Sequence, residues 1–306
     1  MHPAGNSPHR LVTRYPIGSF FVLAYLISWV LWLPLLYGRF ALGWTGWEGS
    51  GWTSLRPYLG MLGAIGPALA AVIMTATLHG RAGLRTLSQR LLLWRTPRWT
   101  WLLALYASWA LATIIAFALG LAPVKTVSLG FAFALINLPV LIFILQAPLL
   151  IGIVGEEVGW RGFALPALLQ RFNPLVASLL LGVGWIFWHA PLAVFPEWRG
   201  HQPLGLFVFN YALLVLPLTL IFTWFFRRTH GSILLAIVLH RAFNLTFNAY
   251  QQALGLSEAA ARDLRHTTIA GLWIIAALLT FHDFRKRGFK SRNQKGVESA
   301  PSTFAE

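Results

Sequence analysis

The sequence predicts an all-α protein, a polytopic membrane bundle of about eight transmembrane helices, with residues 1–306 forming a single integral membrane domain. Two observations support this prediction. Of the 306 residues, 57% are hydrophobic and only 11% are charged, whereas a soluble domain has about 25% charged residues. Apolar blocks long enough to cross a hydrocarbon core of about 30 Å also recur along the whole chain.

Each apolar block predicts one helix. The blocks cover residues 17–37, 58–79, 99–121, 131–157, 175–195, 204–226, 231–250 and 268–284. The first block follows Arg10 and Arg14 as a signal peptide would, but it ends without a small-x-small cleavage site, so we expect a retained span. Between the second and third blocks, leucines alternate with arginines over 80–98, which fits either a helix in the membrane interface or a plain loop. Residues 285–306 are polar and basic, and we expect a disordered tail.

The distribution of basic residues predicts the orientation in the membrane. With the N-terminus in the cytoplasm, the inner segments and the tail hold 17 Lys and Arg residues and the outer loops hold six. This asymmetry indicates a multi-pass protein of a cell membrane, which we expect to be bacterial, with both termini cytoplasmic. It also accounts for the net charge of +15 without a nucleic-acid partner. The absence of cysteine excludes disulfides and thiolate catalysis.

Two glutamates and an arginine follow the apolar residues 131–154, in the segment Gly-Glu-Glu-Val-Gly-Trp-Arg-Gly-Phe at 155–163. One charged side chain at mid-bilayer costs roughly 2.5 to 3.5 kcal/mol, so these groups must face the protein interior and pair. Glu157 and Arg161 are four residues apart and share a helix face, whereas Glu156 points about 100° away. We therefore expect Arg161 to hold Glu157 and leave Glu156 for chemistry.

Two later blocks carry histidine within apolar sequence. His189 follows Trp185 by one helical turn, and His240 is followed by Asn244 at the same spacing. A single intramembrane histidine is usually a packed, hydrogen-bonded contact between helices. Polar groups in three separate spans, however, would lack partners unless the bundle brings them together.

Several known chemistries are excluded by missing residues. The only aspartates, Asp263 and Asp283, lie in an outer loop and at the end of the last predicted span, which excludes an intramembrane aspartyl protease. The chain has neither a His-Glu-x-x-His helix nor a Gly-x-Ser-x-Gly turn. Glutamate, histidine and an amide remain, which can supply a base for water and donors for an oxyanion.

These residues resemble the three motifs of the CAAX-processing and bacteriocin-processing (CPBP, or ABI) intramembrane proteases. The motifs are Glu156-Glu157-x-x-x-Arg161, Trp185-x-x-x-His189 and His240-x-x-x-Asn244, and the resemblance covers about residues 130–250. It implies an eight-helix bundle that cleaves peptide bonds, in eukaryotes after a prenylated cysteine. It also implies a membrane-embedded site that opens toward the cytoplasm.

The resemblance implies a role for each motif residue. Glu156 would be the water-activating base assisted by His189, with His240 and Asn244 as oxyanion donors and Glu157 and Arg161 as a supporting pair. Trp185 stands where the family more often has Phe. Next to His240, Arg241 adds a charge with no predicted partner. The implied partners are the lipid bilayer and a membrane-associated peptide or protein, and the oligomeric state stays open.

Three alternatives stay open at this point. Glu156, His189 and His240 could hold zinc, because two histidines and a glutamate form a known catalytic ligand set. We favour a site without metal or other cofactor, since Asn244 and Arg161 suit hydrogen bonding better than ligation. A transporter would also bury charges, but the sequence shows no inverted repeat. A non-catalytic scaffold, conferring immunity or assisting secretion, could keep the motifs as a structural network.

Overall fold

The computed structural model describes residues 8–40, 60–121, 150–196, 198–253 and 256–298, and it confirms the all-α class, since the described residues contain no strand. Five helical segments are long and apolar enough to cross a membrane: Pro16–Gly38, Gly60–Leu91, Arg98–Ala118, Leu204–Arg228 and Glu258–Asp283. Pro174–Trp188 and Ile233–Thr246 are shorter apolar helices. A polytopic helical bundle is therefore confirmed, and the count of eight spans stays a prediction.

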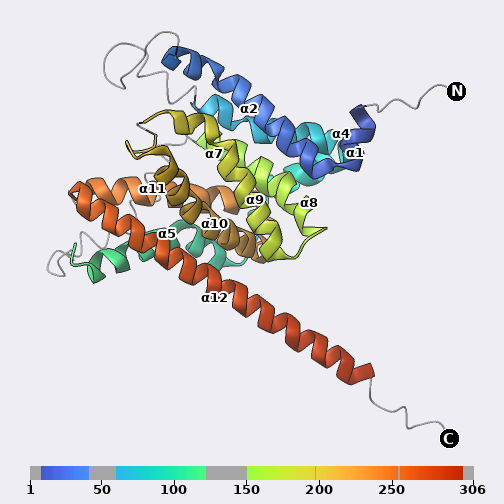
Figure 1. Cartoon of the computed structure of the whole chain (residues 1–306). Helices are drawn as coiled ribbons and strands as arrows, with labels where there is room; N and C mark the ends of the chain where they lie inside the picture. Colours follow the sequence, from blue (N-terminus) through green and yellow to red (C-terminus); the bar gives the residue numbers. More distant parts are fainter. Residues whose placement is uncertain (1–7, 41–59, 122–149, 197, 254–255, 299–306) are drawn as a thin grey trace, which may run out of the picture.

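The described elements follow the predicted blocks with shifted ends (Figure 1). They are α1 (Pro8–Arg14), α2 (Pro16–Phe40), α4 (Gly66–Leu91), α5 (Arg98–Ala118), α7 (Leu150–Gly159), a π-helical turn (Trp160–Ala164), α8 (Leu165–Leu169), α9 (Pro174–Trp188), a 3₁₀ turn (Ala190–Val194), α10 (Leu204–Arg228), α11 (Ile233–Ala253) and α12 (Glu258–Glu298). The largest shifts are in the last block and the fourth. Helix α12 begins at Glu258 rather than at 268 and continues to Glu298, so residues 285–298 are helical and not disordered as expected. The part of the fourth block before Leu150 lies outside the described residues, and its helical run continues to Leu169 rather than ending at 157.

Contacts between helices show that the chain runs up and down through the bundle. A Cβ on Gly63 would lie 1.9 Å from Trp32, and one on Gly66 would lie 2.1 Å from Ser28, so α4 runs antiparallel to α2. Tyr25 of α2 donates a hydrogen bond to the carbonyl of Gly184 in α9 over 2.7 Å. Four residues later, Trp29 donates to that of Trp188 over 3.0 Å, which makes α9 parallel to α2.

The remaining helices obey the same alternation. Ser232 at the start of α11 donates to the carbonyl of Leu93 just before α5. Further along both helices, Thr246 of α11 donates to Ser108 of α5, so the two helices run parallel. The N-terminal ends of α2, α5, α9 and α11 and the C-terminal ends of α4, α8 and α10 therefore lie at the same end of the bundle. We call it the terminus end, because α1 and the C-terminal part of α12 lie there (Figure 1). The opposite end, with residues 195–203 and the start of α12, is called the loop end.

A sharp bend in α4 produces the short helix expected between the second and third spans. Gly80 has φ 58° and ψ −151°, a conformation that glycine adopts without a Cβ clash. The bend folds the chain back, so a Cβ on Gly83 would lie 2.9 Å from Thr75, which is eight residues earlier. Residues 81–91 are helical and mostly exposed except at Leu87. Of the two interpretations of this segment, the helix is the one observed.

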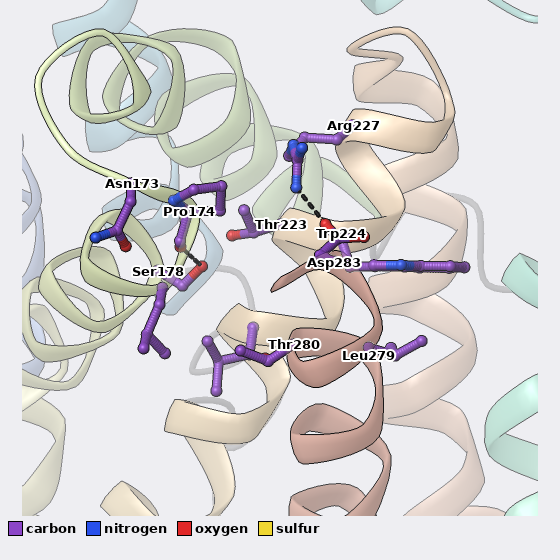
Figure 2. Close-up of a pocket in the computed structure, with 11 residues that line it drawn as sticks. Asn173, Pro174, Ser178, Thr223, Trp224, Arg227, Leu279, Thr280 and Asp283 are labelled. Atoms are coloured by element: carbon purple, nitrogen blue, oxygen red, sulfur yellow. Dashed lines mark hydrogen bonds and ion pairs between the residues drawn. The ribbon is translucent and has the colours of Figure 1, made fainter. Parts of the chain in front are cut away.

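At the terminus end, an ion-pair cluster ties α12 to α10. Asp283 accepts hydrogen bonds from Arg227 over 2.5 Å and from Arg228 over 3.3 Å. In Figure 2, Arg227 and Asp283 meet on one side of a small pocket whose other side is formed by the start of α9. That helix starts where it does because the Asn173 side chain caps the Val176 amide over 3.0 Å. Beyond Asp283, α12 extends away from the bundle (Figure 1).

Candidate active site

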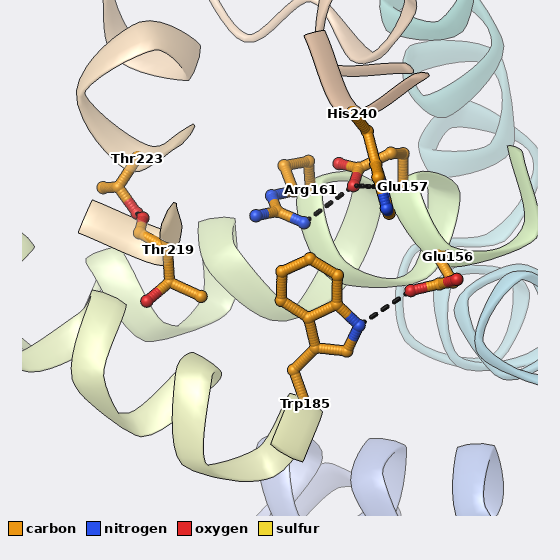
Figure 3. A network of polar contacts seen from close by, with 7 residues as sticks. All are labelled: Glu156, Glu157, Arg161, Trp185, Thr219, Thr223 and His240. Atoms are coloured by element: carbon orange, nitrogen blue, oxygen red, sulfur yellow. Dashed lines mark hydrogen bonds and ion pairs between the residues drawn. The ribbon is translucent and has the colours of Figure 1, made fainter. Parts of the chain in front are cut away.

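A fully buried ionic network lies where the predicted motifs meet (Figure 3). Glu157 and Arg161 are both 0% exposed, and Arg161 donates to Glu157 Oε1 over 2.8 Å, which is the contact expected from their spacing. His240 of α11 places its Nδ1 2.8 Å from the same oxygen. Because a buried charge needs a partner, this three-way contact fixes α7 against α11.

Two aromatic rings flank the buried guanidinium of Arg161. Its central carbon lies 4.4 Å from the centre of the Phe222 ring and 5.1 Å from that of Trp185, both within range of a cation–π interaction. The Trp185 ring also meets His240 edge to face at 5.4 Å. Trp185 therefore packs against the network.

Glu156 points away from Glu157, as the helical geometry predicts (Figure 3). Its Oε2 accepts a hydrogen bond from the indole nitrogen of Trp185 over 2.7 Å. Whereas Glu157 is fully buried, Glu156 is partly exposed. The indole bond uses a lone pair of Oε2, and the Glu156 side chain also lines the adjacent cavity.

His189 ends α9 inside an aromatic cage. Its Nδ1 lies 2.9 Å from the carbonyl oxygen of Trp185, an acceptor, so this nitrogen carries the proton and Nε2 is the accepting nitrogen. The Tyr211 hydroxyl lies 3.1 Å from Nδ1 and 3.3 Å from Nε2. Trp198 stacks on the imidazole with the ring centres 5.5 Å apart. Sequence reasoning missed Tyr211 and Trp198, although the Asn-Tyr pair at 210–211 interrupts an otherwise apolar block.

A cavity of about 340 Å³ brings motif residues together. Its polar lining consists of Glu156, His189, Arg241 and Asn244, and its apolar lining includes Trp188. This volume lies within the range of about 300 to 1,000 Å³ typical of ligand sites. The structure therefore joins Glu156, His189 and Asn244 in one cavity, and it places Glu157, Arg161 and His240 in the network behind them.

The cavity lies toward one end of the bundle. It is lined from the end of α2, the residues just before α4, the start of α7 and the residues after α9, all of which belong to the loop end. Helix α1 and the C-terminal part of α12 lie toward the opposite end (Figure 1). The expectation that termini and active site face the cytoplasm stays a prediction.

The residues considered for zinc are not gathered around one point. Within the described part of the chain, no group of three His, Cys, Asp or Glu side chains is placed to hold an ion. Glu156, His189 and His240 are the alternative ligand set, and His240 directs its Nδ1 to Glu157. The choice between a site with zinc and one without it stays a prediction.

Comparison with known proteins identifies the region that carries this site. Residues 136–246 match the family model described as Type II CAAX prenyl endopeptidase Rce1-like. This stretch is similar to the Rce1-like family, and we call it the Rce1-like segment. The Rce1-like segment contains all three motifs, so the resemblance to CPBP proteases is confirmed.

A curated protein that is similar in sequence to this chain carries a related description. The chain is 31% identical over 157 residues to CAAX prenyl protease 2 of Methanococcus maripaludis, covering 50% of this chain and 53% of the relative. The chain thus spans about half the length of that relative.

Proposed function

We propose that the protein is an intramembrane endopeptidase that hydrolyses a peptide bond of a membrane-associated substrate. The observation that carries the proposal is the separation of the two adjacent glutamates. Glu157 is engaged by Arg161 and His240, whereas Glu156 faces a cavity shared with His189 and Asn244. A prenylated CAAX-type protein is the narrower substrate class that the relative's name suggests.

In the proposed mechanism Glu156 activates water. The carboxylate accepts a proton from a water molecule as the water oxygen attacks the carbonyl carbon of the scissile bond. The Nε2 atom of His189 accepts a hydrogen bond from the other O–H of that water, which orients the water for attack. Collapse of the tetrahedral intermediate breaks the carbon–nitrogen bond, and the proton held by Glu156 passes to the leaving amine.

Asn244 and His240 are the proposed donors to the oxyanion. The Asn244 amide lines the cavity and can donate to the oxygen as negative charge develops on it. His240 already directs Nδ1 to Glu157, so it can donate from Nε2 only when both ring nitrogens carry protons. Glu157 and Arg161 support the site by fixing the position of His240.

The direct test replaces Glu156 with Gln, which keeps the shape of the side chain and removes the base. We expect Glu156→Gln to abolish cleavage of a quenched fluorescent peptide in detergent, with the unfolding temperature unchanged. Asn244→Ala should keep residual activity, since losing one oxyanion donor costs about 10² to 10³ in rate. Glu258→Gln, at an exposed carboxylate on α12, is the matched control. Full activity of Glu156→Gln would exclude the protease, and a scaffold would keep its cellular role without this carboxylate.

The same preparation tests for a metal. We propose a mechanism without a metal or other cofactor, so a chelator should leave turnover unchanged. Stoichiometric zinc that is lost on replacing His189, together with inhibition by chelator, would replace this mechanism with a zinc-dependent one.

A further inference from the structure

We propose that a second cavity, separate from the one that Glu156 lines, binds one anionic phospholipid. It has a volume of about 660 Å³ and lies at the terminus end between α1, α4 and α8. In this assignment the phosphate lies at Arg90 and an acyl chain follows the apolar wall. Among the described residues that line the second cavity, none belongs to the three motifs of the candidate active site. The site is therefore additional to the proposed peptidase function and does not rest on it.

The bend in α4 gives the second cavity two of its walls. Because the chain folds back at Gly80, both halves of the helix contribute to one lining. The half before the bend supplies Thr75 and Leu78, and the half after it supplies Thr86 and Arg90. Helices α1 and α8 and the π-helical turn complete the lining. The volume falls within the range of about 300 to 1,000 Å³ typical of ligand sites.

The surroundings of the second cavity are basic and contain no compensating acid. Arg90 is part of the lining, and the exposed Arg14, Arg81 and Arg85 each adjoin a lining residue in the sequence. No Asp or Glu occurs in α1, α2, α4, the π-helical turn or α8. Clustered like charges without a counterion in the protein attract an anion from outside.

Arg90 is already held in place where a phosphate could meet it. Its Nε donates to the carbonyl of Gly231 over 3.0 Å, one Nη to that of Gly162 over 3.2 Å, and the other Nη to that of Arg161 over 2.6 Å. A guanidinium has five N–H donors, so one remains on each Nη, and this pair suits two oxygens of one phosphate. Because the side chain is ordered before binding, a ligand loses less entropy than at a mobile surface arginine.

The apolar part of the lining favours a lipid over a free anion. Leu78 and Phe163 line the same cavity as Arg90. On α1, the exposed Leu11 and Tyr15 flank the lining residue Thr13. A free phosphate would leave this apolar surface in water, whereas an acyl chain would cover it. Basic pockets between membrane helices are known sites for the headgroups of anionic lipids.

A carboxylate placed in the lining tests the charge without disturbing contacts between helices. Thr86 is exposed, and its hydroxyl donates to the carbonyl of Ala82 in its own helix. Thr86→Glu places a negative charge in the cavity, and Thr86→Gln adds the same bulk without charge. Ser88→Glu is the matched control, because it puts the same charge on the same short helix, outside the lining and about 200° around the axis.

Native mass spectrometry of the full chain in detergent counts the bound lipids, with phosphatidylglycerol and phosphatidylcholine as probes. We expect one phosphatidylglycerol to bind roughly tenfold more tightly than phosphatidylcholine. Thr86→Glu should weaken its binding by about tenfold, and Thr86→Gln and Ser88→Glu should keep it. Equal affinity for the two lipids would overturn the proposal. Equal weakening by Thr86→Glu and either control would also overturn it, because the charge in the lining would then not be the cause.

The unfolding temperature separates a lipid from a free anion. A ligand that binds only the folded protein stabilises it, so phosphatidylglycerol should raise the unfolding temperature of the wild type and of Ser88→Glu but not of Thr86→Glu. Inorganic phosphate at the same concentration should have no effect. An equal rise with inorganic phosphate would overturn the assignment to a lipid.

The same measurement without added lipid shows whether each variant is folded. If Thr86→Glu does not fold, Gln170→Glu replaces it, since Gln170 is also exposed and lines the second cavity. None of these measurements needs a peptide substrate. Absence of cleavage would therefore count against the peptidase alone, and absence of selective lipid binding would count against this site alone.

Discussion

At the level of single residues, Arg161 is the side chain on which the buried network depends. Its guanidinium is fully buried, bonds to Glu157 and lies against two aromatic rings. Arg161→Ala leaves a buried carboxylate with one partner fewer, and breaking a buried pair costs about 3 to 5 kcal/mol. We expect lower expression and a large drop in the free energy of unfolding in detergent. A fully stable Arg161→Ala protein would mean that the pair contributes little to the fold.

A different outcome is expected for Trp185, whose indole nitrogen donates to Glu156 over 2.7 Å. Trp185→Phe removes that donor and keeps an aromatic ring beside Arg161 and His240. A hydrogen bond to a charged group contributes about 1.5 to 3 kcal/mol, so turnover should fall by roughly ten- to a hundredfold with the fold intact. Steady-state cleavage rates and unfolding temperature measure the two effects. Complete loss of activity, equal to that of Glu156→Gln, would make the indole essential rather than supporting.

Sequence reasoning recovered those contacts that lie within one helix. The four-residue spacing of Glu157 and Arg161 was enough to predict their ion pair, and it also predicted that Glu156 points elsewhere. It could not predict that His240 would meet Glu157, because the register between α7 and α11 depends on packing over the whole bundle. Tyr211 was missed for the same reason.

At the level of elements, the position of Glu156 depends on how closely α7 approaches α4. A Cβ on Gly155 would lie 2.1 Å from the carbonyl oxygen of Ala64, a backbone atom that no side-chain rotation can move. Gly155→Ala must therefore push the helices apart, and overpacking typically costs about 1 to 3 kcal/mol. We expect a lower unfolding temperature and reduced turnover, since the displaced residue adjoins Glu156.

Gly205→Ala is the matched control for that substitution. Gly205 is exposed on α10, and an added Cβ would meet nothing within 4 Å. Alanine at an exposed helical position is favoured over glycine by roughly 0.5 to 1 kcal/mol, so stability should stay the same or rise. Equal destabilisation by the two substitutions would show that the close contact with Ala64 is not the reason why alanine at position 155 lowers stability.

Irregular segments account for part of the difference between the predicted and observed elements. Hydropathy ended the second span at 79, but it could not show how sharply the chain bends at Gly80 or that residues 160–164 form a π-helical turn. Arg90 illustrates the consequence. From the sequence, Arg90 was counted among the basic residues that set the topology. In the structure, the bend places its guanidinium where it donates hydrogen bonds to the carbonyls of Gly231, Gly162 and Arg161.

At the level of the whole molecule, composition and periodicity were sufficient for the fold class, because a span must satisfy its backbone internally and therefore forms a helix. The end of the bundle at which the cavity lies was not predictable from the residues, because it depends on how Met61 and Trp198 pack around the ends of several helices. The expectation of a cytoplasmic opening came from family resemblance and stays a prediction.

If orientation follows from charge spread over the terminus end, removing the tail should not invert the protein. A chain that ends after Phe284 loses the six basic residues of 285–295 and keeps those of the 80–98 segment and of α10. The α12 clamp at Asp283 is also kept. We expect Ser88→Cys in the shortened chain to stay protected from an impermeant maleimide in intact cells. A full-length chain with the same six residues changed to Gln separates loss of charge from loss of helix length. Reaction of Ser88→Cys from outside in both chains would assign the orientation to the tail, since C-terminal charges alone can invert a membrane protein.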